Sequence, residues 1–181
     1  MTEETSTQNP MQKVKIEKVT LNIGAGKDQN VLEKGVKLLK NLTGKTPVKT
    51  ITQKRIAGWG LRPGLPIGCK VTLRKKEASL MLLRALDARS GILNGRQFDN
   101  NGNLAFGIPE YIDIKDAKYD PDIGMMGLEI CVTLERPGYR IKRRSFRASK
   151  IPMRHRVTKE DAIKFMRQNF KIKLEEEQGE I

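Results

Sequence analysis

The stretch KTPVKTITQKRIAGWGLRPGLPIGCKVTLRKK, residues 45–76, determines the fold that we predict for this chain. Two β-forming runs, 48–52 and 69–74, flank a loop rich in glycine and proline, which predicts a β-hairpin with a long connection. Side chains alternate along a strand, so the second run has an apolar face and a polar, basic face: Cys69, Val71 and Leu73 against Lys70, Thr72 and Arg74. We expect the apolar face to meet the core and the basic face to stay open.

The same region is strongly basic. Residues 34–76 contain twelve Lys or Arg and no Asp or Glu. Positive charge clustered along one element is typical of a polyanion binder, most often a nucleic-acid binder. Trp59, the only tryptophan, lies in the loop, where it offers a surface on which a base can stack. Burial of Trp59 beneath its own loop remains an open alternative, because tryptophan is highly buried on average.

The N-terminal half predicts a strand and a helix before the hairpin. Apolar residues alternate from Val14 to Ile23, and the alternation changes phase at Glu17–Lys18, which predicts either a bulge or two short strand pieces. Asp28 or Asn30 can cap the following helix, and Gly44 can end it.

The C-terminal half predicts a Leu-rich helix over 77–89, a short hairpin around the turn 99–103, an acidic loop over 109–126 and a strand over 128–134. A capping box at Thr158 starts a helix over 159–170. The resulting order of elements indicates an α+β fold, an antiparallel sheet with helices packed on one face.

A second basic block spans 136–159, with ten Lys or Arg, no acidic residue and few apolar ones. This composition predicts a basic, extended C-terminal segment that is ordered mainly by its partner. We predict a disordered acidic tail over 1–10, a single RNA-binding domain over 11–170 and an acidic tail over 171–181.

The 181-residue chain has a formal charge of +14, although both of its ends are acidic. A compact body this basic suggests a partner that neutralises it. No apolar stretch is long enough to span a membrane and no signal peptide is recognisable, so we expect a cytoplasmic protein. Cys69 and Cys131 are expected to be reduced thiols, although sequence alone does not exclude a disulfide between them.

Chemical motifs are weak. Residues 99–110 have the oxygen-ligand spacing of a calcium loop, but Leu104 replaces the glycine that its sharp turn needs. Thr43–Thr46 resembles the end of a phosphate-binding loop, yet it closes a helix instead of opening one. The only histidine, His155, lies between two arginines and suits phosphate contact better than base catalysis. We therefore expect no catalytic residue, no metal site and no cofactor.

Several motifs resemble the large-subunit ribosomal protein five family: VTLNIGAG (19–26), LTGKTPV (42–48), KRIAGWGLRPGLPIGCKVTLR (54–74) and YDPDIGMMGLEI (119–130). RPGYRIKRR (136–144) and HRVTKEDAIKFM (155–166) resemble its archaeal and eukaryotic branch. The resemblance covers nearly all of 11–170. It implies a monomeric structural protein of the ribosomal central protuberance. Such a protein binds 5S rRNA and nearby large-subunit rRNA, and contacts P-site tRNA and a small-subunit ribosomal protein across an intersubunit bridge.

The resemblance also implies site residues. Contacts with rRNA are expected from the end of the first strand and from the open sheet face: Asn22, Gly24, Gly26, Lys70, Thr72 and Arg74. We add the basic-block residues Lys45, Lys49, Arg143, Arg144, Arg154 and His155. Contacts with tRNA are expected from the hairpin loop, at Lys54, Arg55, Trp59 and Arg62, although the family usually has phenylalanine at position 59.

The leading hypothesis is a non-catalytic RNA-binding protein. A basic sheet with a long hairpin suits irregular RNA better than duplex DNA, because no recognition helix is evident. Two alternatives remain, an RNA-modifying enzyme and a generic polyanion-binding protein. The enzyme predicts a pocket with convergent titratable groups, and the polyanion binder predicts equal affinity for different nucleic acids.

Overall fold

The computed structural model describes residues 9–175. The strands are β1 (Lys15–Gly24), β2 (Val48–Ile51), β3 (Pro66–Leu73), β4 (Ile92–Asn94), β5 (Leu104–Ile108), β6 (Leu128–Glu135) and β7 (Lys173–Glu175). The α-helices are α1 (Gln29–Thr43), α2 (Lys75–Ala88), α3 (Arg140–Arg143) and α4 (Lys159–Phe170). Short 3-10 helices occupy Pro10–Gln12, Ala57–Trp59, Gly95–Gln97, Tyr111–Asp113 and Met153–His155.

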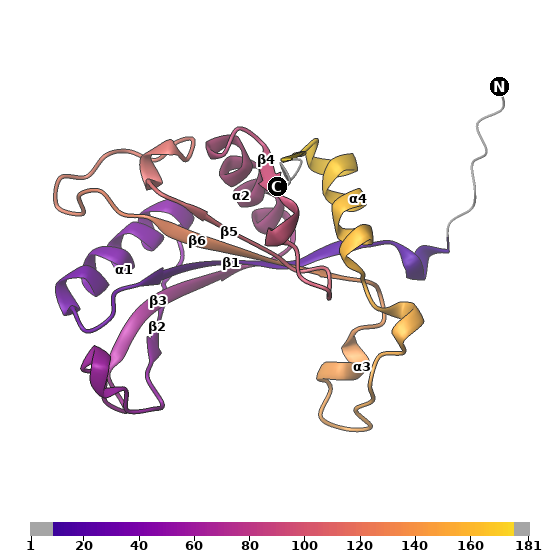
Figure 1. Cartoon of the computed structure of the whole chain (residues 1–181), viewed down its shortest axis with the longest axis horizontal. Helices are drawn as coiled ribbons and strands as arrows, with labels where there is room; N and C mark the ends of the chain where they lie inside the picture. Colours follow the sequence, from indigo (N-terminus) through magenta and orange to yellow (C-terminus); the bar gives the residue numbers. More distant parts are fainter. Residues whose placement is uncertain (1–8, 176–181) are drawn as a thin grey trace, which may run out of the picture.

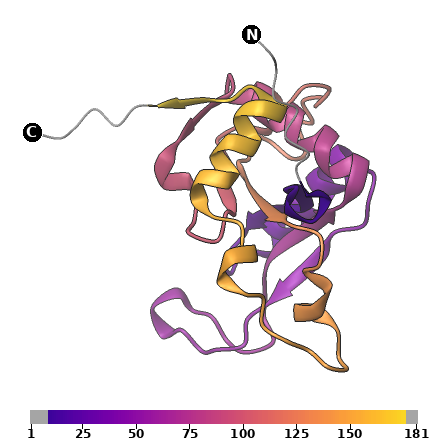
Figure 2. The same cartoon turned by 90° about the vertical axis from the view of Figure 1, so that its right-hand side faces the viewer.

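The main sheet has five strands in the order β2-β3-β1-β6-β5, and each neighbouring pair is antiparallel. Helices α1, α2 and α4 lie on one side of this sheet (Figure 1). The loop between β2 and β3 and the segment between β6 and α4 project from the other side, at opposite ends of the sheet (Figures 1 and 2). The predicted α+β fold with helices on one face is confirmed.

Strand β1 lies at the centre of the sheet. Its pairing with β6 shifts register between Ile16 and Lys18, so the predicted bulge at Glu17 is confirmed. Beyond the bulge, Val19 and Leu21 are fully buried beneath the helices. The bulge leaves Glu17 outside the regular register at one end of the sheet.

Helix α1 is bounded as the sequence predicts. The Asp28 side chain accepts a hydrogen bond from the backbone N–H of Asn30 at 2.9 Å, and Gly44 ends the helix with φ of 67°. Gly35 faces the sheet, where an added Cβ would lie 3.1 Å from Sγ of Cys69 and 3.2 Å from Cγ2 of Ile23. Glycine at this position therefore lets the helix approach the sheet closely.

The hairpin β2–β3 has the predicted two faces. Cys69, Val71 and Leu73 are buried, whereas Lys70 and Thr72 are exposed. Cys131 is exposed on the opposite face of the sheet from Cys69, and both thiols are free. The structure therefore contains no disulfide between them, and burial raises the pKa of the Cys69 thiol.

The predicted hairpin over 96–106 is wrong in its first arm. Gly95–Gln97 forms a 3-10 helix, and Phe98 and Leu104 make only a single bridge. Asn94 and Gln97 exchange side-chain-to-backbone hydrogen bonds in a capping box, which favours a helical turn over a strand. Strand β5 pairs instead with β6. The turn itself is confirmed, because the N–H of Asp99 donates to the Asn103 carbonyl at 2.9 Å.

Two short elements reach into the segments that were predicted as tails. At the C-terminal end, β7 pairs in parallel with β4. Ile172, directly before β7, is buried. At the N-terminal end, Asn9 caps the helix Pro10–Gln12. Residues 1–8 and 176–181 of the two predicted tails lie outside the described residues. Within the described part of the chain, no helix is long and apolar enough to cross a membrane.

Candidate nucleic-acid interface

The face of the sheet opposite the helices carries polar rows across the strands. Asn22 of β1 pairs with Lys70 of β3 on one side and Glu129 of β6 on the other. The next row joins Thr20 to Thr72 and Cys131. We call this surface the open face. It brings the predicted residues Asn22, Lys70 and Thr72 together.

Lys70 is exposed on the open face, and no carboxylate within residues 9–175 pairs with its ammonium group. Asn22 donates from Nδ2 to Glu129 at 3.3 Å. The open face therefore presents a free cation beside amide and hydroxyl groups, a combination that can contact phosphate and sugar oxygens.

The glycines after β1 lie at the rim of this face. No atom stands within 4 Å of a Cβ added at Gly24 or Gly26, so a ligand can approach the backbone there. The N–H groups of Ala25 and Gly26 already donate to the carbonyl of Ile67, at 2.9 and 3.1 Å. The space beside both glycines is open, but the Gly26 N–H group is engaged within the protein.

The loop of residues 52–65, which we call the hairpin loop, is held by its own backbone. The N–H of Gly64 donates to the Thr52 carbonyl and the N–H of Thr52 donates to the Leu65 carbonyl, both at 2.9 Å. Ile56 and Leu61 form a further bridge, and Leu61 is buried at the base. All four predicted tRNA-binding side chains are exposed: Lys54, Arg55, Trp59 and Arg62.

Trp59 settles the alternative that the sequence left open. Its side chain is 69% exposed at the tip of the hairpin loop, so it does not pack beneath the loop. The apolar side chain that the loop buries is instead that of Leu61, which is 5% exposed. Trp59 is therefore free to stack on a base.

The segment of residues 136–157, which we call the arm, is held by side chains. Arg136 Nη2 lies 2.7 Å from Asp161 Oδ2. The Tyr139 hydroxyl accepts from the N–H of Val157 at 2.9 Å and donates to the carbonyl of His155 at 3.3 Å. His155 Nε2 lies 2.8 Å from the Pro137 carbonyl. The arm is thus not uniformly extended, as it contains α3 and a 3-10 turn, and one ring nitrogen of His155 is used inside the protein.

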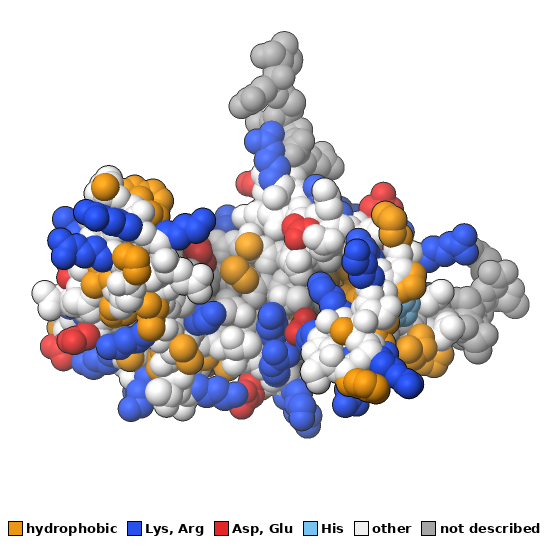
Figure 3. Space-filling view, turned by 90° about the horizontal axis from the view of Figure 1, so that it is seen from below, with side chains coloured by type: hydrophobic (Ala, Val, Ile, Leu, Met, Phe, Trp, Pro, Cys, Tyr) orange, Lys and Arg blue, Asp and Glu red, His pale blue; other side chains and the backbone are white. Residues whose placement is uncertain are grey.

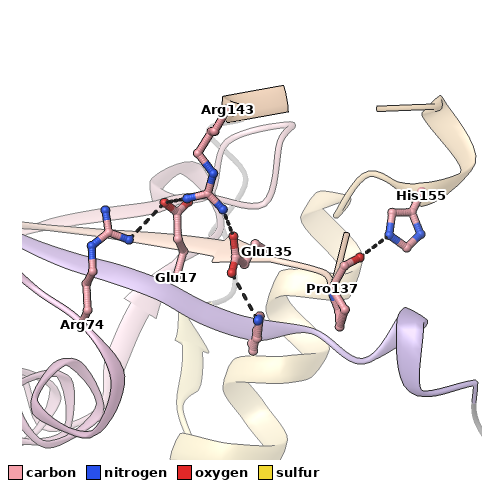
Figure 4. A network of polar contacts seen from close by, with 7 residues as sticks. Glu17, Arg74, Glu135, Pro137, Arg143 and His155 are labelled. Carbon is pink, nitrogen blue, oxygen red and sulfur yellow. Dashed lines mark hydrogen bonds and ion pairs between the residues drawn. The ribbon is translucent and has the colours of Figure 1, made fainter. Parts of the chain in front are cut away.

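An ion-pair network ties the arm to the sheet (Figure 4). Arg143 of α3 donates to both Glu17 and Glu135. Glu17 also accepts from Arg74 Nη1 at 3.3 Å, and Lys15 Nζ lies 3.4 Å from Glu135. The side chains of both carboxylates are only 12% exposed. Arg74 and Arg143, two predicted rRNA contacts, are therefore also structural ion-pair partners.

The remaining predicted cations lie before β2, on β2 and on the arm. Lys49 pairs with Cys69 in the register of β2 and β3, so its side chain leaves the sheet on the side of the helices and not on the open face. Lys49, Arg144 and Arg154 are exposed. Arg144 donates from Nε to the Arg147 carbonyl at 2.8 Å. Lys45 is engaged by Glu77 at the start of α2. Among the described residues, the predicted rRNA-binding set thus divides into cations without a carboxylate partner, such as Lys70, and cations that also hold the fold, such as Arg143.

Sequence reasoning missed Phe146. Its side chain is 74% exposed on the arm, and the Arg147 guanidinium carbon lies 5.2 Å from the ring centroid. An exposed aromatic among arginines is a second surface on which a base can stack. The signal was present in the sequence as a phenylalanine inside RRSFR, the same combination of an aromatic and cations that marked Trp59.

Lys and Arg side chains gather toward both ends of the molecule on the side opposite the helices, and some lie between them (Figure 3). The two projections therefore extend the basic surface beyond the sheet. A polyanion that lies across the open face meets positive charge along its length.

Two carboxyl groups, those of Asp99 and Asp120, have lowered pKa values, and each is explained by hydrogen bonds within the fold. A hydrogen bond from Lys37 at 2.9 Å lowers the pKa of Asp120 and ties the acidic loop 109–126 to α1. The backbone N–H of Asn101 lowers the pKa of Asp99 in the turn 99–103. These groups lie in separate surface elements. Within residues 9–175, no three His, Cys, Asp or Glu side chains are grouped as metal ligands.

Comparison with known proteins agrees with this geometry. Residues 9–62 match the family model described as ribosomal protein L5, and residues 66–174 match the model of the C-terminal part of the same ribosomal family. The chain is 46% identical over 174 residues to the large ribosomal subunit protein uL5 of Sulfurisphaera tokodaii, covering 96% of this chain and 98% of the relative. It is 48% identical over 168 residues to uL5 of Nanoarchaeum equitans, covering 92% and 99%. The chain therefore belongs to the ribosomal protein L5 family, and it is a structural, rRNA-binding protein of the large subunit of the cytoplasmic ribosome and not an enzyme.

Proposed function

We propose that the open face binds 5S rRNA together with neighbouring large-subunit rRNA of the central protuberance. The observation that carries this proposal is the uncovered sheet face with the free cation Lys70, flanked by two basic projections. Irregular RNA can lie on such a face and meet cations at both ends, with phosphates neutralised along its path. The predicted rRNA residues that also make ion pairs, Arg74 and Arg143, present guanidinium groups already oriented by Glu17 and Glu135.

The hairpin loop is proposed to contact P-site tRNA. Trp59 supports this role because it is exposed at the tip, with Arg55 and Arg62 nearby in the loop. The proposed contact with a small-subunit protein across an intersubunit bridge is supported by the family resemblance of the chain.

The proposal is tested by titrating the protein separately with 5S rRNA, with tRNA and with a DNA duplex over a range of salt concentrations. We expect 5S rRNA to bind tightest, with log K falling steeply and linearly against log[salt], because several phosphates release counterions. Equal affinity for the three nucleic acids would reduce the protein to a generic polyanion binder.

A second experiment separates the two RNA partners. Substituting Trp59→Ala and Arg62→Ala together should leave the affinity for 5S rRNA within about 2-fold, since the loop lies apart from the open face, while weakening the tRNA contact on the ribosome. Chemical footprinting of ribosomes that carry the variant measures the tRNA contact. Loss of 5S rRNA binding in this variant would refute the division between face and loop.

A further inference from the structure

An open groove of about 720 Å³ lies between the arm, the open face and the turn 99–103. Three lysines from two different elements line it: Lys18 from β1, and Lys142 and Lys150 from the arm. Within residues 9–175 no carboxylate pairs with any of the three. The groove therefore has free positive charge on two sides.

The turn 99–103 forms another wall of the groove with Asn101 and Asn103. Its position is fixed by Gly102, which has φ of +75° and packs against the arm so closely that an added Cβ would lie 2.5 Å from Cγ1 of Val157. The Asn103 amide donates from Nδ2 to Asp99 at 2.9 Å. This bond orients the amide and leaves its carbonyl oxygen as an acceptor.

The base of the groove is apolar. Leu134, Ile151 and Val157 line it, and because each is at most 6% exposed, they present only a small apolar surface to the groove. Ala148 lines the groove from the arm and has a short side chain, which keeps the space open. The volume lies within the range of small-ligand sites.

We propose that this groove receives one unpaired nucleotide of RNA, extruded from its stack. The lysines neutralise the phosphates on either side of the nucleotide, the base lies over the small apolar surface, and the asparagine amides meet its hydrogen-bonding edge. A regular duplex does not supply such a ligand, because its bases are stacked and paired. The proposal rests on the proposed rRNA-binding function and adds a site whose lining shares only Arg143 with the residues assigned to it.

The test uses the full chain and two labelled probes, a single-stranded ribotetranucleotide with a 5′-phosphate and a blunt RNA duplex of about 12 base pairs, each followed by fluorescence anisotropy. Ala148→Trp fills the groove and keeps every cation. The control is Leu80→Trp, which places a tryptophan at an exposed position of α2, on the helical side of the sheet and away from the proposed RNA surfaces.

We expect Ala148→Trp to weaken binding of the tetranucleotide by about 10-fold and binding of the duplex by less than about 2-fold, because stacking and edge contacts of one base are lost. Leu80→Trp should change the affinity for neither probe. The methyl resonances of Ile151 and Val157 should shift with the tetranucleotide and not with inorganic phosphate, which lacks a base.

An equal loss for tetranucleotide and duplex in Ala148→Trp, or no loss for either, would overturn the inference. Binding to 5S rRNA is measured in parallel with the unmodified chain. If the chain binds 5S rRNA but the groove variant leaves the tetranucleotide unaffected, only the groove inference is overturned. If the chain binds no RNA, both proposals are overturned.

Discussion

The hairpin loop and the arm are both basic, but side-chain contacts to other elements hold the arm to a much greater extent than the hairpin loop. Both are basic, both lack acidic residues, and each exposes one aromatic side chain, Trp59 or Phe146. The hairpin loop is held by its own backbone hydrogen bonds, and no carboxylate within residues 9–175 forms a salt bridge with its cations. The arm is held by side chains, with Arg136 and Arg143 paired to carboxylates on other elements. The difference teaches that a count of basic residues overstates the charge available to RNA wherever cations also hold the fold.

The largest expected effect is the loss in free energy of unfolding when one glycine near each projection is replaced by alanine. Gly102→Ala strains a backbone with positive φ and drives Cβ into Val157, so we expect the free energy of unfolding to fall by about 3 kcal/mol. Gly64→Ala, in the hairpin loop, has the same kind of strain but open space around Cβ, so the loss should be about 1 kcal/mol. Urea unfolding measures both. Equal losses would mean that the arm is not packed against the turn 99–103.

The next largest effect is the difference in free energy of unfolding when one arginine is removed from each projection. Arg143→Ala leaves Glu17 and Glu135 without their shared partner, and we expect a loss of about 1–2 kcal/mol in the free energy of unfolding. This value is below that of a fully buried pair because the Arg143 side chain is 45% exposed. Arg62→Ala should cost less than about 0.5 kcal/mol, as for other exposed positions. The comparison fails if the two variants unfold at the same urea concentration.

Acid should loosen the arm before the hairpin loop. Hydrogen bonds in the turn 99–103, chiefly from the Asn101 backbone, lower the pKa of Asp99 below its ordinary value of 3.8. A carboxyl with a lowered folded-state pKa stabilises the protein above its unfolded pKa, and this contribution is lost as the pH falls through the folded pKa. The hairpin loop contains no carboxylate.

Hydrogen exchange measures this difference. Between about pH 5 and pH 3, the protection factor of the Val157 N–H should fall more than that of the Gly64 N–H. Asp99→Asn should remove part of the pH dependence at Val157. A parallel decline of both amides would argue against a carboxylate-dependent arm.

The smallest expected effect concerns the two exposed aromatics. Trp59→Ala and Phe146→Ala should each change the free energy of unfolding by less than about 0.5 kcal/mol, because neither ring is buried. Thermal unfolding of the two variants beside the parent chain checks this. A large loss for either would show that its ring packs against the protein.

The sequence predicted what depends on local patterns. The bulge at Glu17, the caps at Asp28, Gly44 and Thr158, and the two faces of β3 follow from alternation and capping chemistry, and the structure confirms them. The parallel pair β4–β7 was missed, because two three-residue strands far apart in sequence leave no local signal.

Whether the site residues are paired or exposed was harder to predict. The sequence counted Arg74 and Arg143 as open cations, since nothing local indicates that Glu17 and Glu135 meet them from other strands. The pairing depends on the bulge and on the path of the arm, which are properties of the tertiary fold. The exposure of Trp59 was undecided for the same reason, because it depends on Leu61 filling the base of the loop.

The central claim is that RNA lies on the open face and not on the helical side. Lys70→Gln on β3 and Lys34→Gln on α1 remove one exposed lysine from each side. The measurement is the slope of log K against log[salt] for 5S rRNA. We predict that Lys70→Gln makes the slope shallower by about 0.7–0.9, the value for one phosphate contact, and that Lys34→Gln leaves it unchanged. A shallower slope in Lys34→Gln with none in Lys70→Gln would contradict the account.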